Sequence, residues 1–221
     1  MVDQWLFGVW PYVAAACMVL GPIVRGFAVR RADTDLREEF SATLDCFWSD
    51  ARWRRGMLAI LAGHLVIVLF PTGILSWNRS PTRLLSLEGV LLAAGVLAGA
   101  GLIGLLRHNI DRWHGRSRAA YIESLLLALV TLITVSGLLL AVVNRWATSW
   151  AAVTWPSYLV SVFRMNPDIT VVVQMPFLVR LHVASTLALL TLLPFTSAVS
   201  LVLFPLSRAI DRLGVQVGHS H

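Results

Sequence analysis

The chain contains no lysine, only two cysteines and few charged side chains of any kind. All 18 of its basic residues are arginines, and charged residues make up 14% of the 221 positions. Cys17 lies in a long apolar run and Cys46 in a charged connection, so no disulfide between them is expected. Two cysteines are also too few to bind an iron–sulfur cluster. We therefore interpret both as ordinary thiols.

Hydrophobic residues are correspondingly abundant. They form 57% of the chain, and the mean hydropathy is +0.73, values well outside the range of soluble domains. The sequence therefore predicts an integral membrane protein. Its formal net charge of +6 indicates membrane topology and contact with lipid headgroups. No motif resembles a nucleic-acid reader, so membrane lipid is an expected partner and nucleic acid is not.

Five apolar runs are long enough to cross a membrane, whose core of about 30 Å needs about 20 residues of helix. The runs are continuous rather than alternating, which predicts helices and not barrel strands. The expected fold class is an all-α integral membrane bundle of five transmembrane helices, forming one domain over residues 1–221. The last run exceeds the length that a bilayer requires, which indicates tilt or an extension into water. The predicted spans are approximately residues 4–24, 56–77, 84–106, 121–143 and 177–205.

The arginines predict the orientation of these spans. Thirteen of the 18 fall in the first connection, the third connection and the carboxyl-terminal tail. The positive-inside rule therefore places the N-terminus outside and the C-terminus inside. The amino end has Asp3 as its only charge and no basic region, so no cleavable signal peptide is expected. The arginines predicted to lie outside are Arg79, Arg83, Arg145, Arg164 and Arg180.

Two connections carry a distinctive composition. Residues 25–55 mix arginines with carboxylates, which is typical either of a solvated loop or of a docking surface for a cytoplasmic partner. Residues 144–175 are rich in tryptophan and other aromatic residues, which favours a segment lying in the headgroup plane. Such a segment would cover a site in the outer leaflet.

One histidine lies inside each of two predicted spans. His64 follows Arg55 by nine residues, which places it roughly 13 Å into the membrane. His182 lies near the outer start of the last span. Because these two spans run in opposite directions, we expect both histidines at a comparable depth, where they would share one ligand. Ionisable residues inside a membrane indicate a functional site, with hydrogen bonding between helices as the alternative.

The chemistry of this histidine pair favours a haem. Neutral imidazole suits iron, copper or zinc, but two histidines without a carboxylate or cysteine make a poor zinc site. A haem supplies four equatorial nitrogens itself and needs only two axial ligands. Gly63, beside His64, would let the macrocycle approach the backbone closely. The remaining histidines fall in predicted cytoplasmic segments and receive no role; they are His108, His114, His219 and His221.

The third predicted span combines small residues with one carboxylate. Glycines spaced as in Gly95 and Gly99 allow close helix packing. Glu88 lies just inside the outer end of this span, near Arg83 and Ser86. It is interpreted either as an interface residue or as a proton acceptor beside a quinol.

Four short segments, with their spacing and the five-span pattern, resemble the gamma (cytochrome b) subunit of membrane-bound respiratory nitrate reductases. They are AGHL at 62–65 followed by Pro71, LIGLL at 102–106, FLVRLH at 177–182 and LLPFTSAVS at 192–200. The resemblance covers nearly the whole chain. It implies a prokaryotic cytoplasmic (inner) membrane, two haems b between the second and fifth spans, and quinol oxidation near the outer haem. It also implies electron transfer to iron–sulfur and molybdenum subunits.

By this resemblance, His64 and His182 match the axial pair of the outer haem. The positions of the inner-haem ligands are occupied by Arg54 and Ser200, and neither side chain can serve. Met57 has a thioether but no visible partner. A single haem b is therefore predicted. The lysine that the family has near its quinol site has no counterpart here, which leaves Glu88, Ser86 and Arg83 as candidate quinone contacts.

The leading functional hypothesis is a membrane-anchoring cytochrome b subunit with one bis-histidine haem. It would transfer electrons between the quinone pool and a partner redox subunit of a multisubunit oxidoreductase, whose catalytic centre lies on another chain. Arg180 is expected either to pair with a haem propionate or to anchor the interface. The partner would be a cytochrome c or iron–sulfur subunit outside, or another membrane subunit would supply a relay. The alternative is a haem-free structural or assembly subunit of a respiratory complex.

Overall fold

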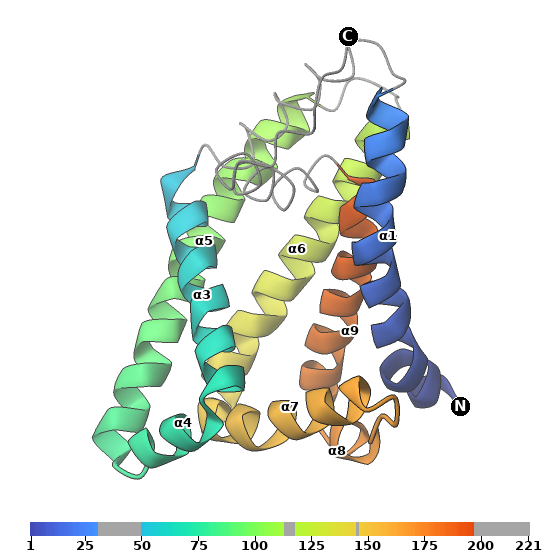
Figure 1. Cartoon of the computed structure of the whole chain (residues 1–221). Helices are drawn as coiled ribbons and strands as arrows, with labels where there is room; N and C mark the ends of the chain where they lie inside the picture. The colour runs from blue at the N-terminus through green and yellow to red at the C-terminus, as the bar shows by residue number, and fades with distance from the viewer. Residues whose placement is uncertain (31–49, 113–117, 145, 197–221) are drawn as a thin grey trace, which may run out of the picture.

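A computed structural model describes residues 1–30, 50–112, 118–144 and 146–196 of the chain. These residues form helices and no strand, as the sequence predicts (Figure 1). Four helices are long and apolar enough to cross a membrane, and a bent pair of helices brings the number to five. The chain is thus an all-α bundle of membrane-spanning helices.

The five long helices follow one another as a row in space. Helix α3 packs on α5, α5 on α6, α6 on α9, and α9 on α1 (Figure 1). A π-helical turn, η1 (Gln4–Val9), precedes α1. The long helices are α1 (Trp10–Arg30), α3 (Ala51–Leu69), α5 (Pro81–Arg112), α6 (Arg118–Val143) and α9 (Phe177–Leu192).

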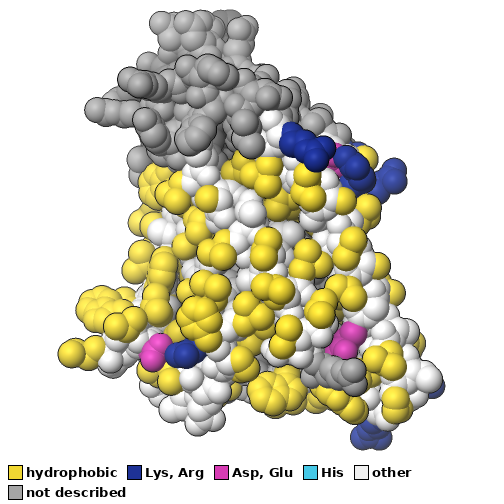
Figure 2. Space-filling view, turned by 180° about the vertical axis from the view of Figure 1, so that it is seen from behind, with side chains coloured by type: hydrophobic (Ala, Val, Ile, Leu, Met, Phe, Trp, Pro, Cys, Tyr) yellow, Lys and Arg dark blue, Asp and Glu magenta, His cyan; other side chains and the backbone are white. Residues whose placement is uncertain are grey.

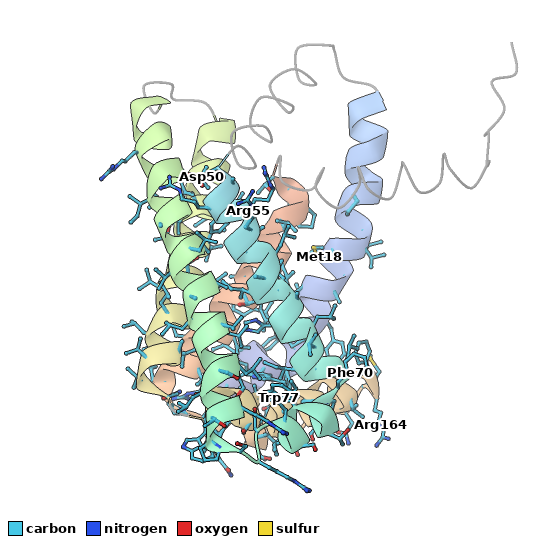
Figure 3. The ribbon with its side chains drawn as sticks, turned by 90° about the vertical axis from the view of Figure 1, so that its left-hand side faces the viewer. Met18, Asp50, Arg55, Phe70, Trp77 and Arg164 are labelled. Atoms are coloured by element: carbon cyan, nitrogen blue, oxygen red, sulfur yellow. The ribbon has the colours of Figure 1, made fainter. Side chains whose placement is uncertain are left out.

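The two ends of the bundle are charged and the band between them is apolar (Figure 2). Figure 3 labels Asp50 and Arg55 at one end of α3 and Trp77 and Arg164 at the other. We call these the Asp50 end and the Trp77 end. If the positive-inside prediction holds, the Asp50 end faces the cytoplasm.

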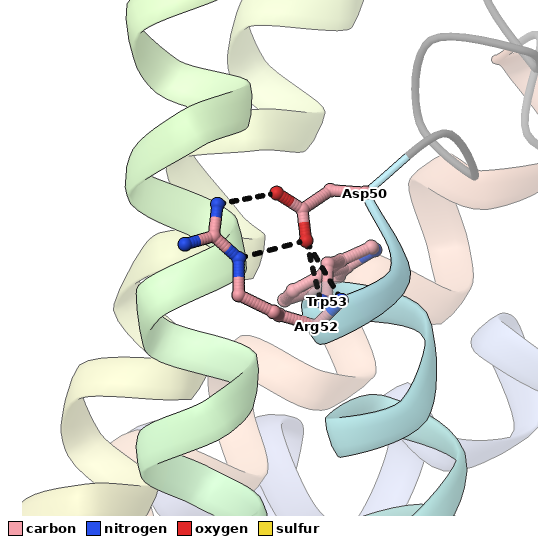
Figure 4. A network of polar contacts seen from close by, with 3 residues as sticks. All are labelled: Asp50, Arg52 and Trp53. Atoms are coloured by element: carbon pink, nitrogen blue, oxygen red, sulfur yellow. Dashed lines mark hydrogen bonds and ion pairs between the residues drawn. The ribbon is translucent and has the colours of Figure 1, made fainter.

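Helix α3 begins at a well-formed N-cap. The Asp50 carboxylate accepts hydrogen bonds from the backbone N–H groups of Arg52 (2.8 Å) and Trp53 (3.2 Å). The Arg52 guanidinium also pairs with it at 2.8 Å (Figure 4). The side-chain hydrogen bond from Arg52, helped by the two backbone N–H groups, lowers the pKa of Asp50 from 3.8 to about 2. The cap thus stays ionised down to acidic pH.

The second predicted span, residues 56–77, is wrong as one continuous helix. Helix α3 ends at Leu69, Phe70 leaves the helical region (φ −124°, ψ 52°), and α4 (Pro71–Trp77) turns away by 101°. Pro71 causes the break because it lacks a backbone N–H and disfavours helical geometry at the preceding residue. The 19 residues of α3 alone extend about 28 Å, which is close to the thickness of a membrane core.

The last predicted span also differs from its expected length. Helix α9 ends at Leu192 and is followed by a short 3₁₀ turn, η2 (Leu193–Phe195). Pro194 lies in this turn, and it removes a backbone donor that a continuing helix would need. Residues 197–205 of the predicted span lie outside the described residues.

The aromatic connection crosses the Trp77 end of the bundle, together with α4 (Figure 1). It contains α7 (Ala147–Phe163), which packs on α3, α4 and α5, and the short α8 (Thr170–Val173). Two tyrosines fasten α7 to the amino-terminal helix. The Tyr158 hydroxyl donates to the Phe7 carbonyl (2.6 Å), and the Tyr12 hydroxyl donates to the Val162 carbonyl (2.9 Å). The segment therefore covers this end of the long helices.

The main hydrophobic core lies toward the Asp50 end. Trp53 is 2% exposed and packs with buried residues of α5 and α6, while Leu189 of α9 contacts the same cluster. Two glycines bring α3 and α5 together here. A Cβ atom on Gly56 would lie 2.4 Å from the Ala98 nitrogen, and one on Gly101 would lie 2.3 Å from the Trp53 nitrogen. The other buried members of this cluster are Leu102, Leu105 and Val130.

Candidate functional site

The imidazoles of His64 and His182 face each other between α3 and α9. Their ring centroids are 6.5 Å apart, and the ring planes differ by 20°. His64 lies in the second half of α3, and His182 lies in the second turn of α9. The structure therefore brings together two histidines that are far apart in sequence, at one level of the bundle.

Each imidazole uses its Nδ1 atom for a hydrogen bond within the protein. His64 Nδ1 lies 2.8 Å from the Ile60 carbonyl oxygen, and a carbonyl can only accept, so this nitrogen carries the proton. His182 Nδ1 lies 2.9 Å from the Ser136 hydroxyl, which itself donates to the Ile133 carbonyl at 3.1 Å. In the neutral form, both histidines therefore present an unprotonated Nε2.

The two rings are stacked nearly parallel, and the distance between their centroids is close to the spacing of two imidazoles that bind one metal ion. Metal–imidazole bonds are about 2 Å long, so two axial imidazoles on one ion place their ring centroids roughly 6 Å apart. In the described part of the chain, no group of three or more histidine, cysteine or acidic side chains could hold a metal by itself. The site thus fits a group that brings its own equatorial ligands, as a haem does.

Two glycines near the histidines have different surroundings. A Cβ atom on Gly63 would lie 2.4 Å from Leu91 Cδ2, so the open side of Gly63 faces α5 rather than His182. Gly137 of α6 was not singled out by the sequence. A Cβ atom there would lie 3.1 Å from His182 Cε1. Gly137, rather than Gly63, is the glycine in contact with an imidazole.

Arg180 lies two residues before His182 and reaches the amino-terminal segment. Its Nη1 is 3.5 Å from the Asp3 carboxylate, an ion pair that the sequence did not suggest. Its Nε is buried and has no hydrogen-bond partner within the described structure. A buried donor of this kind is costly unless a ligand satisfies it. The Nε–H group of Arg180 can therefore donate to an acceptor on a bound ligand.

The three candidate quinone contacts do not converge on one site. Arg83 lies over the Trp77 ring at 5.4 Å, and its carbonyl accepts from Trp77 Nε1 (3.0 Å) and from the Ser86 hydroxyl (2.7 Å). Glu88 instead accepts two hydrogen bonds of 3.3 Å from Thr148, through its backbone N–H and its hydroxyl. Since Thr148 lies in the first turn of α7, Glu88 acts as a carboxylate cap for that helix.

Asn78 joins this contact and was not predicted. Its side chain is in the turn after α4, is only 6% exposed, and donates to Thr148 Oγ1 (3.0 Å) and Ser149 Oγ (2.8 Å). Its Oδ1 has no partner within the described structure. The only sequence signal was a polar residue in a short turn before Pro81. Ser136 was missed as well, although it is a hydroxyl next to a glycine inside an apolar run.

The residues at the expected inner-haem positions can be compared only in part. Ser200 lies outside the described residues, and Arg54 follows the core residue Trp53 on α3. Met57 packs against the Trp53 cluster together with Ile60. Among the described residues, the hydrophobic cluster around Trp53 therefore lies beside position 54.

Comparison with known protein families shows the family of the chain. The family model of the nitrate reductase gamma subunit matches residues 3–215, which is nearly the entire chain. The comparison with curated proteins found no match. The matched family is a haem-containing cytochrome b membrane subunit of an oxidoreductase, and its members associate with other oxidoreductase subunits. With a match over this length, and with paired intramembrane histidines in an all-helical bundle, the chain belongs to the nitrate reductase gamma subunit family.

Proposed function

We propose that this chain holds a single haem b between His64 and His182 and transfers electrons between the quinone pool and a partner redox subunit. The observation that carries the proposal is the pair of facing imidazoles, 6.5 Å apart, each with its Nδ1 bonded within the protein. A bound haem supplies one-electron chemistry at its iron. The chain itself binds and orients, and the catalytic centre belongs to another subunit.

The protein residues have distinct tasks in this proposal. His64 and His182 provide the axial nitrogens, and their Nδ1 hydrogen bonds hold each ring in one orientation. Arg180 offers its unpartnered Nε to a carboxylate such as a haem propionate, while Asp3 holds the guanidinium in place. His182 is half-buried whereas His64 is exposed, so a bound haem would cover the His64 ring.

The packing at the Asp50 end supports one haem rather than two. A second macrocycle would need space between α3 and α9 on that side. Trp53 fills the core among α3, α5 and α6 at this end, and Met57 of α3 and Leu189 of α9 pack against its cluster. Interiors of this kind are close-packed, and additional volume costs stability. Together with arginine at position 54, this core argues against a second haem between the same helices.

The position of the site restricts the route of the electrons. The aromatic connection and α4 lie across the Trp77 end, which the arginine distribution predicts to be the outer end. A haem nearer this end suits an outer partner such as a cytochrome c or iron–sulfur subunit. A cytoplasmic iron–sulfur and molybdenum partner would require a relay from another membrane subunit. Both arrangements belong in a prokaryotic cytoplasmic membrane.

Quinol exchange remains part of the proposal, with Glu88 as its candidate proton acceptor. Arg83 and Ser86 are engaged at the start of α5, whereas Glu88 presents a carboxylate that is only partly buried. Its hydrogen bonds to Thr148 use one oxygen, Oε1. Among the described residues no hydrogen bond is seen to the second oxygen, and in this proposal it exchanges the proton with the quinol.

A haem-free structural subunit is the alternative function. The observation in its favour is the hydrogen bond between His182 on α9 and Ser136 on α6, since it joins two helices without any cofactor. This contact uses only Nδ1, however, and it does not account for Nε2 of either histidine. Haem content therefore separates the two functions.

The decisive experiment measures haem per chain in purified protein by the pyridine haemochrome method. One haem per chain is expected, and both His64→Ala and His182→Ala should lose the absorbance bands of reduced haem. His108→Ala is the matched control and should keep them. Two haems per chain would refute the argument from Arg54 and the Trp53 core. No haem in the wild type, or full haem content in both histidine variants, would favour the structural function.

A further inference from the structure

We propose that Ser136, with Gly137 beside it, is the positioning residue for His182 and raises the electron-donor strength of that ligand. The proposal rests on the function above, because it assumes that His182 binds haem iron. It adds a residue on a third helix, α6, to a site built from α3 and α9. It also predicts a redox property that the histidine pair alone does not determine.

The direction of the hydrogen bonds is the first argument. Ser136 Oγ lies 3.1 Å from the Ile133 carbonyl and 2.9 Å from His182 Nδ1. The Ser136 hydroxyl gives its one proton to the Ile133 carbonyl, so its oxygen accepts from the imidazole N–H. The same carbonyl also bonds the His182 ring, which likewise requires the ring nitrogen to be the donor. The chain of donors therefore runs from His182 to Ser136 to the α6 backbone. It keeps the proton on Nδ1 and the lone pair on Nε2.

Burial is the second argument. Ser136 is 2% exposed, and among the described residues it is one of the most deeply buried polar side chains. No bulk water can replace its oxygen as an acceptor in this position. The Ile133 carbonyl also bonds the His182 ring, so loss of the hydroxyl would remove one of two acceptors on α6 and weaken the hydrogen bonding of the buried N–H.

Gly137 supplies the third argument because it permits the close approach of α6. A Cβ atom at this position would lie 3.1 Å from His182 Cε1 and 3.7 Å from Nδ1. The first distance is tighter than ordinary van der Waals contact, so an alanine would push the ring away from Ser136. The absence of a side chain at Gly137 thus allows the hydrogen bond at Ser136 to form.

The two histidines differ in which helix supplies the hydrogen-bond acceptor for Nδ1. His64 donates to the carbonyl of Ile60, four residues earlier in its own helix, so its orientation depends on α3 alone. His182 depends on a side chain from another helix. A change at Ser136 therefore alters one axial ligand and leaves the hydrogen bond of the other intact.

The expected consequence follows from the chemistry of ligating imidazoles. An acceptor on the second nitrogen increases the basicity of the ligating nitrogen and fixes the ring. A more basic ligand stabilises the ferric state relative to the ferrous state. Removal of the acceptor should therefore raise the midpoint potential of the iron, and a tenfold change in that relative stabilisation corresponds to about 59 mV for one electron.

The test compares variants by haem content, redox titration and the low-temperature EPR spectrum of the ferric protein. Ser136→Ala should retain haem with a raised midpoint potential and altered g values, and Ser136→Thr should restore the wild-type values because it keeps a hydroxyl. Gly137→Ala should hold haem roughly tenfold less tightly. Thr134→Val is the matched control, since that hydroxyl bonds only to Val130 in its own helix.

The outcomes separate this inference from the proposed function. If Ser136→Ala binds haem with the potential and g values of the wild type, the positioning role is refuted. If Ser136→Ala does not accumulate, Ser136→Thr decides: wild-type values support the role, and shifted values contradict it. If the wild type contains no haem, or His182→Ala retains it, the proposed function fails instead.

Discussion

The two halves of the bundle are built from the same helices but pack in different ways. Toward the Asp50 end, glycines draw α3 against α5, and Trp53 closes the space among α3, α5 and α6. Toward the Trp77 end, α3 carries His64 and α9 carries His182, and the centroids of the two rings are 6.5 Å apart. The difference teaches that one half is closed by a hydrophobic core, whereas the other brings two ionisable side chains together.

This contrast gives a physical reason for the single-haem proposal. A two-haem subunit needs paired ligands and open space in both halves. In the half toward Asp50, position 54 is an arginine and the described core contains the Trp53 indole, and both features support that proposal. Stability and cofactor binding should therefore be separable by mutation.

The largest effect is expected for Trp53→Ala. Removal of a buried tryptophan leaves a cavity and should lower the free energy of unfolding by about 4 kcal/mol. Unfolding in detergent, followed by far-UV circular dichroism at rising SDS fraction, measures this change. Haem content should stay at the wild-type level. Trp150→Ala is the control because Trp150 is 61% exposed and lies on α7. Loss of haem in Trp53→Ala would show that the two halves are not independent.

A smaller effect is expected for Gly101→Ala. Its Cβ would lie 2.3 Å from the Trp53 nitrogen, so α3 and α5 would have to separate. The cost should be about 2 kcal/mol, in the range for overpacked interiors. The same unfolding assay applies. Gly89→Ala on the same helix is the matched control, because a Cβ there has no atom within 4 Å. Equal stability of the two variants would contradict the close α3–α5 contact.

The smallest effect concerns the N-cap of α3 and its pH dependence. The pKa of Asp50 is about 2 in the folded protein, compared with 3.8 for an aspartate in the unfolded chain. The ionised cap therefore contributes fully to stability above about pH 4. This contribution should decrease as the pH falls from about 4 toward 2. Asp50→Asn keeps a capping side chain but should abolish this part of the pH dependence. Unfolding transitions of both proteins between pH 2 and pH 6 would check it, and parallel curves would exclude the role.

Several features of the fold were predictable from the sequence because they depend on local chemistry. Long apolar runs indicated membrane helices, and a histidine inside each of two runs indicated a site. The histidine pair was recognisable because an ionisable side chain in hydrocarbon needs a compensating partner. The break at Pro71 was not predicted, although its cause is equally local. The proline was read as part of a span because the residues on both sides are apolar.

The side-chain contacts around the candidate site were harder to predict from the sequence. Gly63 was expected to face a haem, yet its open side faces Leu91 of α5. The rotation of α3 decides this, and that rotation is fixed by its packing on α5. Glu88 was grouped with Arg83 and Ser86 by proximity in sequence, whereas the arrival of α7 directs it toward Thr148. Side chains that are close together on one helix can thus belong to different sites, because each contacts a different neighbouring helix.

The sequence by itself determined that this protein lies in a membrane. It also determined the approximate positions of the membrane helices and the two histidines that lie within them. These properties follow from hydrophobicity and from the cost of placing an ionisable group in a membrane. Only the tertiary structure decided that the imidazoles face each other, that Ser136 and Gly137 contact one of them, and that Trp53 fills the opposite half. These features depend on how helices rotate and approach one another, and packing between segments distant in sequence sets both.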